Sequence, residues 1–243
     1  MKNSEQFLDY FNKIDKFIKE TEAFDSSIGF TVKVKKSINK VVKRFKEELI
    51  SLAELRNAIV HNPRIDNEYI AEPHTKTVER IIFLHKEITN PEKVIPAFQF
   101  KVLGAIQEEY LNDILITMKQ SSFSQFPVFD DDNQVVVELI NTNTISRWVS
   151  GRLEENGTIM IEQVKVKDLI PEIEFKKNYK FISRNTSVYE AHEMFLDQIN
   201  RKGRNLDVLF ITNSGNPTEK LLGLITIEDI ATKVQFVRHI GER

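Results

Sequence analysis

The stretch that decides the fold is Leu221-Leu222-Gly223-Leu224-Ile225-Thr226-Ile227-Glu228-Asp229-Ile230. Its apolar residues up to Ile225 indicate a buried strand, and Gly223 lets another group approach the backbone closely. Thr226 has the character of a helix N-cap, and Asp229 falls in the first helical turn, where a carboxylate suits the positive end of the helix dipole. The sequence therefore predicts a strand that runs into a helix, with a hydroxyl and a carboxylate one turn apart.

This junction has the chemistry of a ribose site. A carboxylate such as that of Asp229 accepts hydrogen bonds from a cis-diol, and the hydroxyl of Thr226 adds a further contact. The residues Gly223, Thr226 and Asp229 resemble the nucleotide-binding signature of a CBS domain, which is Gly-apolar-x-Thr/Ser-x-x-Asp. An ordinary capped helix after a strand explains the same ten residues equally well.

An internal repeat supports the resemblance, because the order helix, strand, turn, strand, helix occurs twice after about residue 92. The expected strands are 125–129 and 135–140 in the first copy, and 208–211 and 221–225 in the second. The run Phe126-Pro127-Val128-Phe129-Asp130 is close to the "PV.D" strand of CBS domains. The resemblance covers roughly residues 92–237. It implies a tandem CBS pair, or Bateman module, of two βαββα-type units at 92–155 and 160–243.

The resemblance also implies a site for an adenosine nucleotide, namely AMP, ADP or ATP, as a regulatory ligand. In the family the segment that enters the unit completes the pocket. Here backbone near Ile182 and Arg184 would meet the base, and Arg184 would meet phosphate. Thr186 or Ser187 would cap the next helix near the phosphates. Arg184 is equally compatible with a plain surface position.

The two copies differ at the ligand signature. Alignment of Leu139-Ile140 with Leu224-Ile225 puts Glu138 at the glycine position, Asn141 at the threonine and Thr144 at the aspartate. The first copy therefore lacks both the glycine and the carboxylate. We expect the second copy to be the one that binds nucleotide.

Residues 1–90 predict an all-α helical domain, which makes the whole chain a two-part α+β protein. Apolar residues recur at helical spacing from Phe7 to Ile18, and a second helix is expected to carry one apolar face from Ile38 to Leu52. Between Lys33 and Lys46 there are seven basic residues and no acidic one. This run indicates either a solvated helix face or a surface for RNA phosphates.

Arg56, Asn57 and His61 stand near the expected end of the second helix, because Pro63 disfavours a helical residue before it. Such side chains could cleave a phosphodiester without metal: His moves a proton, Arg neutralises the phosphate, and Asn orients it. Alternatively, the cationic residues simply face the carbonyls at the helix end.

The pattern Arg56-Asn57-x-x-x-His61 in a helical domain resembles the HEPN superfamily, whose signature is Arg, four to six residues, then His. This resemblance implies a symmetric homodimer with two Arg/His sets around one RNA groove. Many members are metal-independent endoribonucleases, while others have lost cleavage and serve as interaction domains.

The composition sets ordinary bounds for a chain of 243 residues with 41% hydrophobic residues and a net charge of −2. The absence of cysteine excludes disulfides and thiol chemistry and fits a cytoplasmic protein. No run is long and apolar enough for a membrane span, and no phosphate-loop, dinucleotide-fold or zinc-protease motif occurs. We expect no metal site.

These observations lead to one main hypothesis and two alternatives. In the main hypothesis the CBS pair senses an adenine nucleotide and controls a HEPN-like domain that cleaves RNA through Arg56 and His61. The first alternative is a non-catalytic, ligand-responsive module that mediates dimerisation or partner binding. The second is a nucleic-acid binder that does not cut.

Overall fold

The computed structural model describes residues 2–62, 69–130, 132, 135–152, 157–158, 161 and 163–239, with the backbone alone for 234–239. Residues 2–92 form one compact unit and residues 93–235 form another. We call them the helical unit and the α/β unit. Each is described by itself.

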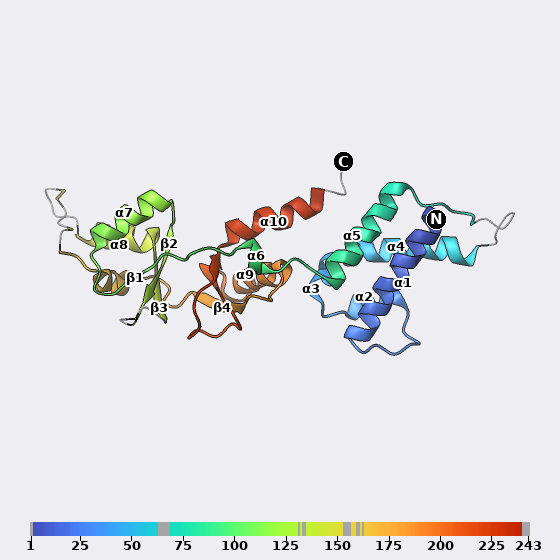
Figure 1. Ribbon diagram of the computed structural model, residues 1–243, viewed down its shortest axis with the longest axis horizontal. Coiled ribbons are helices and arrows are strands. Elements are labelled where there is room, and N and C mark those ends of the chain that lie inside the picture. Colours follow the sequence, from blue (N-terminus) through green and yellow to red (C-terminus); the bar gives the residue numbers. More distant parts are fainter. Residues whose placement is uncertain are drawn as a thin grey trace. The chain divides into compact units, whose positions relative to one another are not determined.

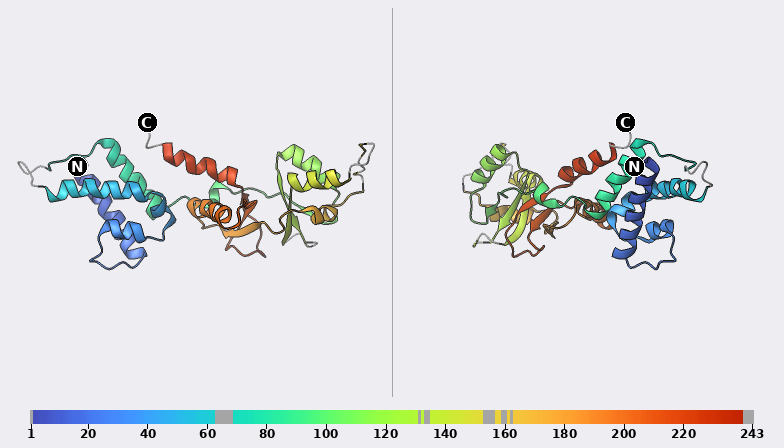
Figure 2. Two further views of the ribbon diagram at one scale, coloured as in Figure 1. Left: turned by 180° about the vertical axis from the view of Figure 1, so that it is seen from behind. Right: turned by 45° about the vertical axis from the view of Figure 1, so that its right-hand side comes forward.

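The helical unit contains helices and no strand among its described residues (Figure 2). Its helices are α1 (Asn3–Thr21), α2 (Phe30–Lys36), α3 (Lys40–Arg44), α4 (Lys46–His61) and α5 (Thr75–Thr89). Helix α1 packs along α5, and α2 packs on α4. Most of the apolar stripe expected in the first helix is buried, namely Phe7, Phe11, Ile14 and Ile18, with exposures of 4% or less. The prediction of a helical N-terminal region is thus confirmed.

The second helix is not continuous, which corrects the expectation of one apolar face from Ile38 to Leu52. The chain leaves the helix at Ser37, and the side chain of Ile38 is 75% exposed. The break is stabilised because the Glu22 carboxylate accepts from the backbone N–H of Ile38 at 2.9 Å, and Asn39 caps α3 by accepting from Val41 N at 2.8 Å. Polar side chains therefore satisfy the backbone groups that a continuous helix would have bonded internally.

Helix α4 is tied to α5 by a charged contact with good geometry. Arg80 donates to both carboxylate oxygens of Glu48, from Nε at 2.6 Å and from Nη2 at 2.8 Å. The guanidinium also lies over the rings of Phe45 and Phe83, at 5.5 and 4.9 Å from the centroids. Because the Arg80 side chain is only 16% exposed, this contact is screened less than a surface ion pair.

The α/β unit contains two three-stranded sheets of the same topology, one in each half (Figure 1). The first consists of β1 (Ala105–Ile106), β2 (Gln125–Phe129) and β3 (Val136–Asn141), and the second of β4 (Tyr179–Ser183), β5 (Val208–Thr212) and β6 (Gly223–Ile225). In both, the first strand is parallel to the second and the third is antiparallel to it. The helices are α6 (Val94–Ala97), α7 (Leu111–Ser121), α8 (Thr142–Arg152), the 3-10 helix η1 (Val166–Glu172), α9 (Val188–Lys202) and α10 (Ile227–His239).

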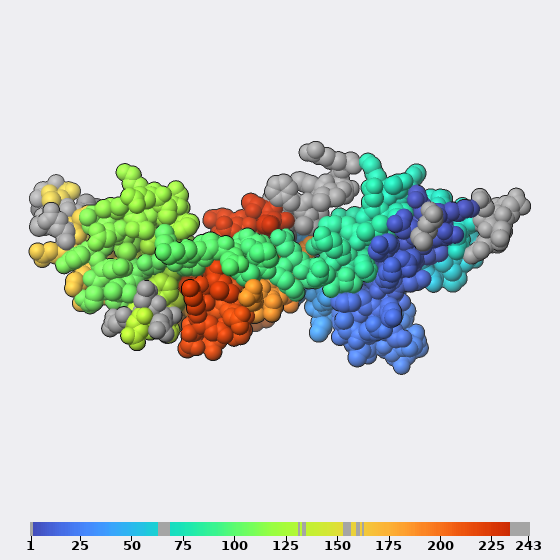
Figure 3. Space-filling view, in the orientation of Figure 1, coloured from blue at the N-terminus to red at the C-terminus, as the bar shows by residue number. Residues whose placement is uncertain are grey.

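Each half has its own core, and a small cluster of Val136, Leu139, Val208 and Phe210 joins the two sheets. The core of the second half includes Val94 and Ile95 of α6, although these residues precede the first half in the chain. The segment after α6 lies on the surface (green in Figure 3) beside the turn before β6 (orange-red). The N–H of Phe100 donates to the carbonyl of Leu222 at 3.2 Å. Residues 94–100 therefore belong structurally to the second half.

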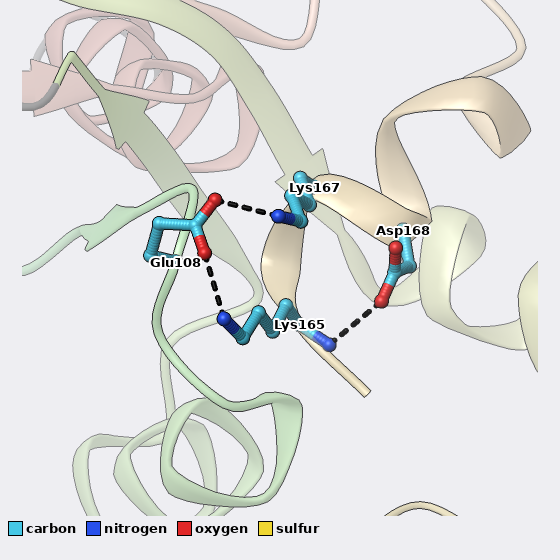
Figure 4. Close-up of polar contacts among 4 residues, drawn as sticks. All are labelled: Glu108, Lys165, Lys167 and Asp168. Carbon is cyan, nitrogen blue, oxygen red and sulfur yellow. Dashed lines mark hydrogen bonds and ion pairs between the residues drawn. The ribbon is translucent and has the colours of Figure 1, made fainter. Parts of the chain in front are cut away.

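A carboxylate fixes η1 to the loop after β1 (Figure 4). Glu108 accepts from Lys165 Nζ and Lys167 Nζ, both at 2.7 Å, and Asp168 accepts from the backbone N–H of Lys165 at 2.9 Å. The hydrogen bonds from the two ammonium groups lower the pKa of Glu108 to about 2. This contact joins the segment that precedes α7 in the sequence to the segment that follows α8.

Candidate functional site

The junction of β6 and α10 is built as the sequence predicts locally. The Asp229 carboxylate accepts from the Thr226 hydroxyl at 2.7 Å and from the Thr226 N–H at 2.9 Å, while Asp229 N–H faces the Thr226 hydroxyl at 3.4 Å. This reciprocal pair caps the helix. Both short bonds end on Oδ2, and Asp229 is exposed, so its carboxylate can accept further hydrogen bonds from a ligand.

Gly223 is required by the protein itself. A Cβ at this position would lie 2.0 Å from the carbonyl oxygen of Phe98, closer than real side chains approach backbone. The segment that follows α6 therefore passes directly over β6. This close approach sets one wall of the space in front of Thr226.

That space is a cleft of about 570 Å³, which we call the Thr226 cleft. Besides Thr226 and Asp229 it is lined by Phe100 and Lys101 from the segment after α6, and by Phe123 from the turn after α7. The rings of Phe100 and Phe123 are 6.0 Å apart and partly exposed, at 38% each. An exposed aromatic pair of this kind offers faces on which a flat ring can stack.

Sequence reasoning did not identify these three additional residues. Phe100, Lys101 and Phe123 come from two connecting segments with no motif, and only the tertiary fold brings them to the cleft. The available signal was the presence of large aromatic residues in connecting segments, where they have no helical or strand face to bury.

The other residues expected at the nucleotide site lie elsewhere and do not line the Thr226 cleft. Ile182 is 3% exposed in the core of the second half. Arg184 follows the end of β4 with an exposed side chain, and its N–H donates to the carbonyl of Thr212 at 2.9 Å. The carbonyl of Thr186 accepts from the N–H of Val94 at 2.9 Å. The ligand role of these three residues remains a prediction.

The strand register agrees with the alignment of the two copies. Leu139 pairs with Pro127 as Leu224 pairs with Phe210, each at the third residue of the central strand. At the glycine position, Glu138 is 5% exposed and accepts from the N–H of Lys177 at 2.9 Å. The third strand of each half thus contacts the segment that precedes the sheet of the other half: β3 contacts the segment before β4, and β6 contacts the segment before β1.

The first half offers no carboxylate at its helix start. Asn141 accepts from both the N–H and the hydroxyl of Thr144, at 2.9 and 3.1 Å. The acceptor is therefore the first residue of the pair here, whereas in the second half it is the last residue, Asp229. The corresponding cleft measures about 200 Å³. Two arginines lie in it: Arg204 stacks 4.1 Å above the ring of Phe175, and Arg147 is paired with a glutamate at 4.0 Å. This cleft is smaller than the Thr226 cleft and is lined by charged side chains.

Arg56, Asn57 and His61 come together at the end of α4. Arg56 Nη1 lies 3.1 Å from His61 Nε2 and 3.3 Å from Asn57 Oδ1. Because a guanidinium can only donate, the contact with His61 is a hydrogen bond when Nε2 carries a lone pair and the ring proton is on Nδ1. That is the form of imidazole that can accept a proton from a substrate hydroxyl.

At the end of α4 one carbonyl of the last turn is bonded by a side chain other than His61. The helix ends at His61, as predicted, and Asn62 donates its side-chain amide to the carbonyl of Ala58 at 2.6 Å. His61 is exposed and bonded to Arg56 rather than to its own helix end. In the basic run, Lys33 is instead buried and paired with Asp15 at 2.6 Å, while Lys35, Lys36 and Lys43 are exposed.

Two further findings concern the described residues as a whole. No three His, Cys, Asp or Glu side chains among them are grouped so that they could hold a metal ion. None of the helices in this part of the chain combines the length and the apolarity needed to cross a membrane.

Comparison with known families gives one match: residues 166–235 match the CBS domain. No curated protein sequence matches the chain. The chain therefore has a CBS domain in its C-terminal part and a helical N-terminal region.

Several solved structures are similar in fold. A signal-transduction protein with CBS domains from Burkholderia ambifaria is 15% identical, with 55% of this chain and 82% of that chain covered and a TM-score of 0.40. The CBS domain pair of protein MJ0100, in complex with 5-methylthioadenosine and S-adenosyl-L-methionine, is 11% identical over 60% of this chain and 98% of that chain, with a TM-score of 0.41.

A third similar structure is a protein from Methanocaldococcus jannaschii named as a candidate archaeal homologue of g-AMPK. It is 16% identical over 75% of this chain and 63% of that chain, with a TM-score of 0.44.

Proposed function

We propose, from the CBS domain at residues 166–235, that residues 93–235 act as a tandem CBS pair that binds an adenosine nucleotide and regulates the helical unit. One observation supports this proposal above the others. The segment that lines the Thr226 cleft, residues 97–101 and 103, follows α5 of the helical unit after only a few residues. A ligand in this cleft therefore touches the segment of the α/β unit that follows the link between the two units, residues 90–93, with only α6 between them.

The chemistry of the cleft suits a nucleoside with an anionic group. The Asp229 carboxylate would accept hydrogen bonds from the ribose diol, because it keeps exposed acceptor capacity after capping α10. Phe100 and Phe123 would stack on the base, and the ammonium of Lys101 would meet a phosphate. AMP, ADP and ATP share all three groups.

Regulation requires that the ligand prefers one arrangement of the protein over another. A nucleotide that binds equally well to both arrangements would change nothing, however tightly it binds. In this proposal the position of residues 97–103 differs between the arrangements. Because those residues form the cleft wall, the two arrangements would differ in nucleotide affinity.

The output would be metal-independent RNA cleavage by the Arg56, Asn57 and His61 group in a homodimer of HEPN-like helical units. His61 Nε2 would accept the proton of the ribose 2′-hydroxyl as that oxygen attacks the phosphorus. The bond from phosphorus to the 5′-oxygen would break, leaving a 2′,3′-cyclic phosphate, and the 5′-oxygen would take a proton from water. Arg56 would move to the phosphate, and Asn57 would orient it. The exposed position of His61 and its bond to Arg56 support this output over a purely structural role at the helix end.

The sensing half is tested by calorimetric titration of the full chain with AMP, ADP and ATP. Asp229→Ala should weaken binding by about tenfold or more, because hydrogen bonds to a charged group are lost. Asp113→Ala is the matched control, since Asp113 is also an exposed acid in a first helical turn but lies outside the cleft. Equal affinity of wild type and Asp229→Ala would remove the proposed site.

The output is tested by RNA degradation without metal, with and without nucleotide. Loss of cleavage in His61→Ala, but not in His74→Ala, would give His61 a chemical role, because His74 is an exposed histidine of the same unit. No cleavage under any condition would instead favour the non-catalytic interaction module.

A further inference from the structure

The helical unit has a hollow beside the Arg56 group that none of the roles above uses. It measures about 390 Å³, and its lining comes from α1, the loop before α2, α2 itself and α4. This volume is within the usual range of roughly 300–1,000 Å³ for small-molecule sites. Arg56 and Asn57 are part of its lining. The hollow is therefore continuous with the residues proposed to act on a phosphate.

One wall of the hollow is aromatic. The rings of Phe11 and Phe30 are 4.5 Å apart and tilted by 48°. Phe11 is 4% exposed and fixed in the core, whereas Phe30 is half-buried at the start of α2. The wall thus combines a rigid and a more accessible aromatic surface, which suits a flat, partly apolar ring.

The polar part of the lining includes a carboxylate, Asp15, that favours ligand groups able to donate a hydrogen bond. Asp15 is paired with the buried Lys33 at 2.6 Å, yet its side chain remains 35% exposed. Lys33, at 4% side-chain exposure, needs this partner because an unpaired buried ammonium is strongly unfavourable. Asp15 is consequently held in place as a fixed acceptor that offers no donor. A ligand group beside it has to donate a hydrogen bond.

We propose that this hollow binds the base of the RNA nucleotide next to the phosphate held by Arg56, and that Asp15 selects bases with an exocyclic amino group. The inference rests on the proposed RNA output. An aspartate accepts from the amino group of cytosine, whereas uracil presents a carbonyl oxygen at the same ring position. The exposed Lys35 and Lys36 on the same helix as Phe30 would attract the RNA backbone.

The test measures binding to the full chain by fluorescence anisotropy, with labelled 2′-O-methyl oligonucleotides of cytidine and of uridine. These probes cannot be cleaved, so binding is measured independently of catalysis. We expect the cytidine probe to bind about tenfold more tightly than the uridine probe, the effect of one good base contact. Equal binding of the two probes, or no binding of either, would overturn the proposal.

Two variants locate the effect. Gly29→Leu should weaken binding of both probes and reduce the preference, because Gly29 lines the hollow and a Cβ there meets nothing within 4 Å, so that the larger side chain can take up space in the hollow. Gly151→Leu is the matched control and should bind as wild type, because Gly151 is an exposed glycine of α8, outside the helical unit, where a Cβ also meets nothing within 4 Å. Asp15→Asn should remove the cytidine preference, because an amide can both donate and accept. If Asp15→Asn fails to fold without a partner for Lys33, Gly29→Leu still decides, since unchanged binding in Gly29→Leu contradicts the site.

Cleavage of the corresponding 2′-hydroxyl oligonucleotides separates the two proposals. A cytidine preference in binding without any cleavage would retract the ribonuclease and keep the base site. Cleavage of both oligonucleotides with equal binding would retract the base site and keep the ribonuclease.

Discussion

The close approach at Gly223 allows a quantitative prediction. In Gly223→Ala the new Cβ would start 2.0 Å from the carbonyl oxygen of Phe98, and Cβ atoms essentially never lie under 3.0 Å from a neighbour. Either β6 or the segment at Phe98 must move by about 1 Å, the difference between these two distances. Neither can move freely, because Phe100 N–H is bonded to the Leu222 carbonyl at 3.2 Å.

The expected cost follows from these contacts. Overpacking of this kind costs about 1–3 kcal/mol, and weakening one backbone hydrogen bond adds about 1 kcal/mol. Replacing a glycine returns about 0.5–1 kcal/mol of chain entropy. We therefore expect Gly223→Ala to lower the free energy of unfolding of the α/β unit by about 2 kcal/mol.

Urea denaturation provides the measurement, followed by far-ultraviolet circular dichroism and by the fluorescence of Trp148. Trp148 is the single tryptophan of the chain, is 2% exposed and lies in the α/β unit. The matched control is Gly151→Ala, because a Cβ on Gly151 meets nothing within 4 Å and the residue lies within α8. The free energy of unfolding of Gly151→Ala should equal that of wild type or be slightly higher. A Gly223→Ala protein as stable as the control would refute the inferred contact.

Three other changes have defined outcomes. Arg80→Lys should lower the free energy of unfolding by about 1–2 kcal/mol in urea titrations, because a lysine ammonium lacks the planar fork that makes two parallel bonds to the Glu48 oxygens. A change below the error of the fit would contradict this role. Since the pKa of Glu108 is lowered from 4.5 to about 2, its stabilising effect is present above pH 4.5 and lost as pH falls towards 2. Wild type should therefore exceed Glu108→Gln in urea midpoint at neutral pH but not near pH 2, and a constant difference would argue against the ammonium contacts. Gly215→Ala should lower the free energy of unfolding by about 1–2 kcal/mol, because φ of Gly215 is +91° and a Cβ would lie 3.3 Å from Ser183 N. A melting temperature equal to that of wild type would contradict this expectation.

Local features of the sequence predicted local structure well. The strand expected at 125–129 is β2, since its turn residues and apolar run are adjacent in the sequence. The Thr226–Asp229 cap and the Arg56–His61 contact also followed from spacing along one helix. In each case the interacting groups lie within a few residues of one another.

Long-range features could not be predicted in this way. Nothing in Val94 or Ile95 indicates that they pack into a core formed more than eighty residues later. The break near Ile38 depends on a carboxylate from the end of α1, Glu22, that no periodicity reveals. Phe100 and Phe123 become neighbours only when two connecting segments meet.

The position of residues 94–100 has a consequence for folding during synthesis and for the bounds of a stable fragment. They leave the ribosome long before β4, α9 and β6. Their apolar side chains therefore cannot be buried in their native core until the second half has been synthesised. A fragment that begins at residue 166, where the CBS match starts, would contain both flanking helices α9 and α10 yet lack this inserted piece. Its core would be open beside β6, and the smallest piece that retains a complete second half begins before Val94.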